Sequence, residues 1–164
     1  MNTKKITIIS LLAAMTALLT FFPHIPIPGT QGYIHLGDSI IYLTAFALGG
    51  SAAAFAGAIG GAIADLLVAP VYAIPTCIIK GLAGFISGYI FTRCKNKSKG
   101  KILAFISGGI IITIGYYIAE LIMTSSTVVP LAGMPYNIIQ TIGSIPIPCL
   151  VLPQVVKLIG KTQN

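Results

Sequence analysis

The sequence predicts an all-α membrane protein, a compact bundle of six transmembrane helices with its N and C termini cytoplasmic. Hydrophobic residues make up 55% of the 164 residues, and charged residues only 8%. The mean hydropathy of +0.94 is higher than a soluble domain tolerates on its surface. The basic residues lie almost wholly between the apolar segments, where membrane topology explains the net charge of +7. We therefore expect one domain over residues 1–164, located in the cell membrane.

Six apolar segments fit a chain of this length at about 20 residues per span. The first follows Lys4 and Lys5 and lacks a small-x-small cleavage site, so it is interpreted as an uncleaved helix rather than a signal peptide. The expected helices cover residues 6–22, 33–48, 52–68, 74–92, 102–123 and 136–156.

The connections carry turn-forming or charged residues. Three prolines and a glycine predict an extended, non-helical stretch over 23–32, a candidate lid. The stretch 93–101, RCKNKSKGK, holds five positive charges and no negative one. It is separated from the basic residues near each terminus by even numbers of crossings, so all three clusters can be cytoplasmic. The loops 23–32, 69–74 and 124–135 are then outside. Pro146, Pro148 and Pro153 should kink or break the last helix.

Ionisable residues occur within these apolar segments, where a charge at mid-depth costs about 3 kcal/mol or more. The helical rise predicts a shared depth for five polar residues, about 18 to 27 Å from the cytoplasmic boundary of a hydrocarbon core about 30 Å thick. These are Asp38, Asp65, Lys80, Glu120 and Gln140. Asp65 and Lys80 are predicted to lie at nearly equal depth on neighbouring antiparallel helices. Such a pair can form a salt bridge, and its role is either structural or in ligand binding.

Helix faces add further polar groups at this depth. Asn137, Gln140, Thr141 and Ser144 share one face of the last helix, either lining a pocket or holding helices together. Tyr116 and Tyr117 stand one turn before Glu120, and His35 stands one turn before Asp38. The convergence of five helices at one depth favours a small-molecule pocket on the extracellular side. The candidate binding residues are His35, Asp38, Asp65, Lys80, Tyr117, Glu120, Asn137 and Gln140.

Small residues recur at four-residue spacing, which allows helix backbones to approach closely. Gly57 and Gly61 form one such pair, and Gly84 and Gly88 form another. On the first helix, Ala13 and Ala17 form A-x-x-x-A. We assign this face to an outside partner, because the other helices already enclose the polar pocket.

Other functional classes lack their sequence signals. The three cysteines are single residues without metal-ligand or redox spacing. No zinc-protease, serine-hydrolase or nucleotide-binding motif is present, so we expect neither an enzyme nor a bound cofactor or metal. Nucleic-acid binding needs a solvated basic face, which the positions of the lysines do not favour.

Three stretches together resemble a known family. They are YIHLGDSIIYL, a Gly/Ala-rich helix ending in ADLL, and IIKGLAGFISGYIF after a proline-flanked turn. They are similar to the substrate-binding S components of energy-coupling factor (ECF) vitamin transporters, and most similar to the hydroxymethylpyrimidine and pyridoxine group. The resemblance is strongest over 33–91. It implies vitamin capture at the outer side, a lid at 23–32, and association with a transmembrane coupling subunit and two ATPase subunits, with Ala13 and Ala17 facing the coupling subunit.

The leading hypothesis is therefore a substrate-capture subunit of an ATP-driven vitamin importer in the lipid bilayer. One alternative is a self-contained transporter or facilitator that uses Asp65 or Glu120 as a proton or sodium site. Another is a scaffold without a ligand, in which apolar replacements of Asp65, Lys80 and Glu120 would be neutral or stabilising. The sequence alone does not choose between a pyrimidine, a pyridine, a purine and a deazapurine as the bound ring.

Overall fold

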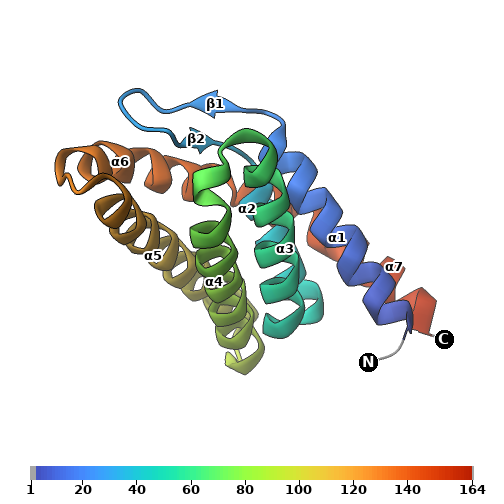
Figure 1. Cartoon of the computed structure of the whole chain (residues 1–164). Coiled ribbons are helices and arrows are strands. Elements are labelled where there is room, and N and C mark those ends of the chain that lie inside the picture. Colours follow the sequence, from blue (N-terminus) through green and yellow to red (C-terminus); the bar gives the residue numbers. More distant parts are fainter. Residues whose placement is uncertain (1–2, 164) are drawn as a thin grey trace.

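The computed structural model describes residues 3–163 of the backbone and the side chains of residues 3–158. Within this part of the chain, seven α-helices are joined by turns and one two-stranded hairpin (Figure 1). In chain order the elements are α1 (Thr3–Phe21), β1 (Ile25–Pro26), β2 (Tyr33–Ile34), α2 (Gly37–Leu48), α3 (Gly50–Val68), the short 3₁₀ turn η1 (Pro70–Tyr72), α4 (Ala73–Arg93), α5 (Lys97–Thr124), α6 (Val128–Gly143) and α7 (Pro146–Gln163).

Five helical stretches are long and apolar enough to cross a membrane, namely 3–21, 50–68, 70–93, 97–124 and 128–158. A sixth apolar helix, α2, has 12 residues. Large apolar side chains such as Leu67, Ile74 and Ile122 remain exposed on the outer faces, where lipid rather than water is the fitting neighbour. The predicted all-α, multi-pass membrane architecture is confirmed, with six apolar segments.

Helix α2 is the centre of the bundle and is enclosed by its neighbours. Its first ten residues, 37–46, are all buried, and α1, α3, α4 and α7 pack around it. The predicted start at Tyr33 is wrong, because Tyr33 and Ile34 pair with the preceding strand and the helix begins only at Gly37. A helix of 12 residues rises about 18 Å, so its first turn lies inside the bundle rather than at the membrane surface.

Helices α3 and α4 approach each other through glycine. A Cβ added at Gly57 would lie 2.8 Å from the carbonyl oxygen of Lys80, and one at Gly84 would lie 2.6 Å from the carbonyl oxygen of Ala53. Real Cβ atoms do not come this close, so both positions require glycine for this packing. The close approach predicted from the glycine spacing is confirmed, and it fixes Lys80 against α3.

The second half of the chain departs from the predicted boundaries. Helix α5 starts at Lys97 instead of 102, and the Asn96 side chain caps it by accepting a hydrogen bond of 3.0 Å from the Lys99 N–H. The predicted outer loop 124–135 is helical from Val128 onwards. The helix predicted over 136–156 breaks before Pro146, which has no N–H to continue α6 and opens α7 instead. The predicted break at the prolines is confirmed at Pro146, whereas Pro153 lies within α7.

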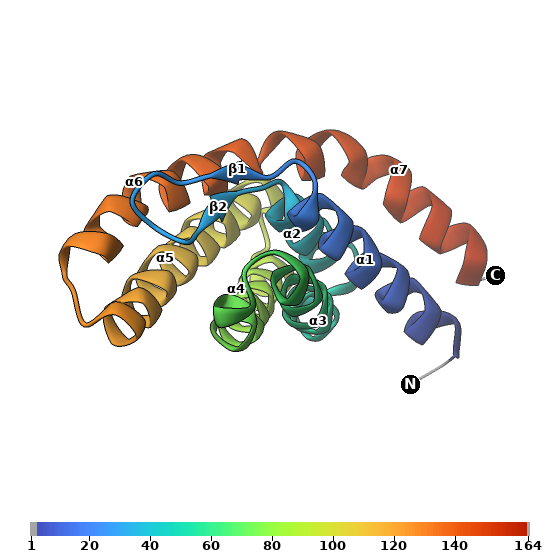
Figure 2. The same cartoon turned by 45° about the horizontal axis from the view of Figure 1, so that its top comes forward.

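The hairpin and the basic segments lie at opposite ends of the bundle. In Figure 1 the hairpin caps one end, whereas the start of α1, the α4–α5 connection and the end of α7 lie at the other. Figure 2 shows α6 and α7 as one bent path that arches beside α5 and α2. The basic clusters therefore share one end, as the topology prediction requires. That this end is cytoplasmic stays a prediction, and Lys161 has no described side chain.

Candidate functional site

A short antiparallel hairpin covers one end of the helices. Ile25 pairs with Ile34 and Pro26 with Tyr33, and the Ile27 N–H donates to the Gly32 carbonyl at 3.0 Å. The segment 23–32 is thus non-helical, as predicted from its prolines.

The hairpin places two aromatic side chains over the helices. The Tyr33 ring stacks on His24 with their centroids 4.4 Å apart, and His35 follows two residues later, at the entrance to α2. We call residues 23–36 the lid.

A small polar cavity lies beneath the lid. Its walls come from the lid and from α3, η1, α5 and α6, and its volume is about 30 Å³. The lining residues are Ile27, Gly32, Tyr33, His35, Asp65, Tyr72, Tyr116, Glu120, Asn137 and Gln140. A volume of this size holds about one water molecule. The hairpin therefore packs closely over these polar groups, and its opening as a lid stays a prediction.

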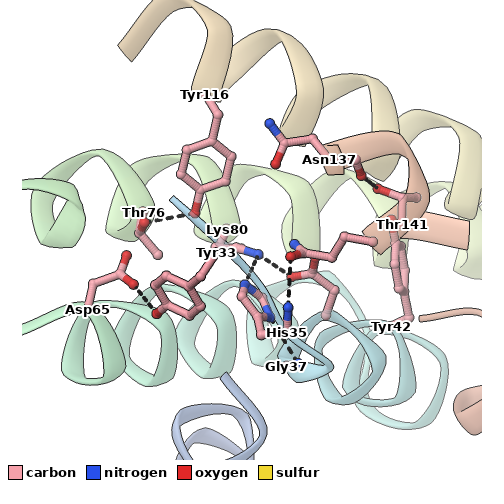
Figure 3. Close-up of polar contacts among 12 residues, drawn as sticks. Tyr33, His35, Gly37, Tyr42, Asp65, Thr76, Lys80, Tyr116, Asn137 and Thr141 are labelled. Atoms are coloured by element: carbon pink, nitrogen blue, oxygen red, sulfur yellow. Dashed lines mark hydrogen bonds and ion pairs between the residues drawn. The ribbon is translucent and has the colours of Figure 1, made fainter. Parts of the chain in front are cut away.

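A buried ion pair joins Lys80 to Asp38 behind the cavity wall, where Asp38 also contacts the cavity-lining Gln140. Figure 3 shows Lys80 beside His35. The side chains of the ion pair are 1% exposed. The other Asp38 oxygen accepts a hydrogen bond of 2.8 Å from the Gln140 amide. The possible Asp65–Lys80 bridge considered from the sequence is not formed. Equal height on neighbouring helices did not fix the direction of each side chain: Lys80 pairs with Asp38 of α2, whereas Asp65 accepts a hydrogen bond from Tyr33.

Asp65 is held by the lid instead. The Tyr33 hydroxyl donates a hydrogen bond of 2.5 Å to the Asp65 carboxylate. Burial, and then the neighbouring Asp65, raise the pKa of Tyr33 above its ordinary value, so this hydroxyl keeps its proton and remains a donor. The contact joins the lid to the last turn of α3 in the wall of the cavity.

Glu120 has only half of its carboxylate satisfied. Its Oε1 accepts a hydrogen bond of 2.9 Å from the Tyr72 hydroxyl, whereas Oε2 is buried and has no hydrogen-bond partner among the described residues. The residue as a whole is 4% exposed. Burying a carboxylate oxygen without a hydrogen-bond donor costs free energy. Glu120 Oε2 therefore remains free to accept a hydrogen bond in this cavity.

His35 connects the lid to the ion pair. Its backbone N–H donates to the Gln140 side-chain oxygen at 3.1 Å, and its Nδ1 accepts from the Gly37 N–H at 3.1 Å. The proton of the neutral ring is then on Nε2, which lies 3.3 Å from Lys80 Nζ. Two donors meet there, so Lys80 directs its hydrogen bond to Asp38. Burial, followed by the Lys80 ammonium, lowers the pKa of His35 to about 3.

The structure gathers most of the predicted binding residues. Five of the eight line the cavity, and two more form the ion pair behind it. The five are His35, Asp65, Glu120, Asn137 and Gln140.

Tyr117 is the exception. It does not line the cavity, whereas Tyr116 does. On a helix, the residue four positions before Glu120 lies about 40° from its direction, and the residue three positions before lies about 60° away on the other side. Tyr116 therefore turns inward, and its hydroxyl lies 2.7 Å from the Thr76 hydroxyl.

Two further tyrosines were missed. Tyr33 was assigned to a helix and Tyr72 to an outer turn, yet each donates to a cavity carboxylate. The signal available in the sequence was an aromatic residue with a hydroxyl at the same outer depth as Asp65 and Glu120.

The Ala13–Ala17 face of α1 packs largely inside the bundle. Ala13 is 6% exposed, and a Cβ at Gly60 of α3 would lie 2.4 Å from its carbonyl oxygen. Ala17 is half-buried, and Ala14 is exposed. An apolar groove of about 300 Å³ between α1 and α3 includes Ser10, Ala13 and Ala14 in its walls. A partner role for Ala13 and Ala17 stays a prediction, and the groove is the part of this face that a partner can reach.

Two larger clefts on the outer surface are of a different kind. They have volumes of about 550 and 330 Å³ and lie along α5, beside α4 and α6 respectively. Their walls are largely isoleucine, and they offer few groups that could orient a polar ligand. Lipid chains suit such surfaces, whereas the cavity under the lid is lined by carboxylates, amides and hydroxyls that can orient a polar ligand.

Two comparisons with known proteins bear on this site. The sequence model of a family described as "ECF-type riboflavin transporter, S component" matches residues 1–157. A Pyrococcus woesei protein, described as an uncharacterized protein in a gap 3' region, is 38% identical over 97 residues, which are 59% of this chain and 65% of that protein. The alignment thus spans less than two thirds of that relative's length. The family match covers every helix of the bundle up to residue 157, including all the residues that line the cavity.

Proposed function

Because this chain belongs to the family of S components of ECF transporters, we propose that it captures a small vitamin or vitamin precursor in the cavity under the lid. It is a transport protein rather than an enzyme. An ECF transmembrane coupling subunit and two ATPase subunits would then supply the ATP-driven step. The lid end of the bundle would face the extracellular side, opposite the basic clusters.

The observation that carries this proposal is the placement of the acidic residues. The chain has three aspartate and glutamate residues in total, and all three are buried at or directly behind one cavity. Burying carboxylates within a membrane bundle is costly, and Glu120 Oε2 has no donor in the closed state. A bound ligand that supplies hydrogen-bond donors would offset this cost.

We propose a single-ring heterocycle such as hydroxymethylpyrimidine, a thiamine precursor, or a pyridoxine-like ring. The small closed volume and the tyrosines around the cavity support a small aromatic ring with amine or hydroxyl groups. Riboflavin is a second candidate, favoured by the description of the matching family. Its three fused rings would require a much larger opening of the lid and of α6.

A self-contained transporter is the alternative from another mechanistic class. It is favoured by the same unpartnered Glu120 oxygen, which could exchange a proton. This mechanism would require transport by the chain alone, without ATP.

Two experiments separate these functions. Tagged protein purified from its native membrane should bring the coupling and ATPase subunits with it, and the isolated chain should bind a vitamin from a screened panel without transporting it. Uptake by the purified chain alone in proteoliposomes, driven by a proton or sodium gradient, would contradict the proposal.

A further inference from the structure

The charges around the cavity do not balance. Asp38, Asp65 and Glu120 supply three carboxylates, whereas Lys80 is the cation that the structure records in an ion pair there. His35 does not compensate, because its Nδ1 accepts a hydrogen bond from the Gly37 N–H and the buried ring is neutral. If the carboxylates are ionised, the site holds two negative charges in excess.

The three carboxylates are not equivalent. Asp38 is matched by the Lys80 ammonium and the Gln140 amide. Asp65 and Glu120, which line the cavity, accept hydrogen bonds from the neutral hydroxyls of Tyr33 and Tyr72. Any negative charge on Asp65 or Glu120 therefore lies on the cavity side of the network and lacks a cation of its own among the described residues.

Glu120 is the carboxylate with free capacity. Its Oε2 is buried without a partner, and glycines approach both of its oxygens. A Cβ at Gly133 would lie 3.1 Å from Oε2, and one at Gly32 would lie 3.8 Å from Oε1. At these two positions, one in the lid and one in α6, no side chain stands between the backbone and Glu120.

We propose that the ligand is held by a cationic nitrogen group that donates N–H hydrogen bonds to Glu120, so that the ligand itself neutralises part of the excess negative charge. This inference rests on the proposed function and specifies its substrate class. A protonated aminopyrimidine or a primary ammonium group has the required chemistry, because its N–H bonds to a carboxylate are charge-assisted. Phosphorylated and carboxylated forms of the same ring are excluded, since they would add negative charge to a carboxylate-rich cavity.

Matched ligand pairs test the charge requirement directly. Calorimetry on the purified full-length protein would use hydroxymethylpyrimidine against its analogue with a hydroxyl in place of the amine, and pyridoxamine against pyridoxine. Pyridoxamine phosphate and riboflavin complete the panel. In at least one pair the amine should bind about tenfold to a hundredfold more tightly than its hydroxyl partner. The phosphate ester should not bind.

The variant Glu120→Gln tests the residue. It keeps the shape of the side chain and an acceptor for the Tyr72 hydroxyl but removes the charge, so the preference for the amine should disappear. Tyr117→Phe, on the same helix but off the cavity wall, is the matched control and should retain the preference. Without any ligand, the melting temperature of Glu120→Gln should be no lower than that of the wild type, because a partly satisfied buried charge has been removed.

Several results would overturn the inference. These are a neutral or anionic compound as the tightest ligand, no binding by either amine, an unchanged preference in Glu120→Gln, or a lower melting temperature in its ligand-free form. Tight riboflavin binding together with co-purified ECF subunits would refute the charge requirement and leave the S-component function intact. Gradient-driven transport by the chain alone would refute the proposed function instead.

Discussion

Lys80 of α4 and Asp38 of α2, 42 residues apart in the sequence, form an ion pair that is buried directly behind the cavity. The pair joins the central helix to its neighbour, and its hydrogen bonds continue through Gln140 to the backbone of His35. It therefore connects the packing of the bundle to the position of the lid.

Replacing one residue of this ion pair should destabilise the fold far more than replacing both. Lys80→Met or Asp38→Asn alone should each lower the free energy of unfolding by roughly 3 to 5 kcal/mol, because one charge stays buried without its partner. The double variant should recover most of this loss. The measurement is a double-mutant cycle of unfolding in mixed detergent micelles. Additive losses in the double variant would show that the two charges are not coupled.

The contact between Tyr33 and Asp65 should hold the lid closed. Tyr33→Phe removes the donor, and about 1 kcal/mol of hydrogen-bond free energy should speed ligand release roughly fivefold. Asp65→Asn keeps an acceptor for the Tyr33 hydroxyl and should change release less. Release rates can be followed by stopped-flow displacement of a labelled ligand. Equal release from Tyr33→Phe and the wild type would remove this contact from the gate.

His35 should make the fold sensitive to acid. Because its pKa is lowered to about 3 in the folded state, the unfolded chain binds a proton first. The stability from the neutral ring is complete above pH about 6.5 and is lost as the pH falls from there towards 3. The loss approaches about 1.4 kcal/mol per pH unit.

The comparison with His35→Gln isolates this effect. Lys80, Asp38 and His24 also act on the ring, and these groups remain in the variant. The difference between wild type and variant should therefore shrink as the pH is lowered from 7 to 5. Melting temperatures across this range provide the measurement, and a constant difference would contradict the assignment.

The α1–α3 groove specifies which residues of α1 a partner helix would contact. Ala13→Trp should damage the fold itself, since Ala13 is buried against α3. Ala14→Trp at the exposed edge of the groove should instead reduce ATP-driven uptake by the assembled complex by at least about tenfold, because a bulky residue blocks close helix contact. Ligand binding by the isolated subunit should stay intact. Normal uptake by Ala14→Trp would place the partner surface elsewhere.

Hydropathy and residue spacing predicted the fold well, because both depend only on position along the sequence. The number of apolar segments, the glycine contacts between α3 and α4, and the break at Pro146 all follow from linear patterns. The depth of the polar residues was predicted in the same way, and it correctly brought Glu120, Asp65 and Gln140 to one cavity.

The wrong predictions concern which way a side chain points around the helix axis, and whether a segment forms a helix, a strand or a loop. Predicted depth allowed Lys80 to pair with Asp65, but its partner in the structure is Asp38. The prediction also assigned Tyr117 to the pocket, whereas Tyr116 is the tyrosine that lines it. Tyr33 and Ile34 are apolar enough for a helix but pair with β1 instead. The helical turns at Val128 were hidden by Pro130 and Pro135, which suggested a loop.

Recovery of bound ligand tests the central claim, that the cavity under the lid is the vitamin site, most directly. Wild-type protein and Gly133→Leu would be purified in a vitamin mixture, washed, denatured and analysed by mass spectrometry for released compounds. The leucine would extend against Glu120, since even a Cβ at Gly133 lies 3.1 Å from its Oε2. The account predicts near-stoichiometric release of one small heterocycle from the wild type and almost none from a folded Gly133→Leu protein. Equal recovery of the same compound from both proteins would contradict it.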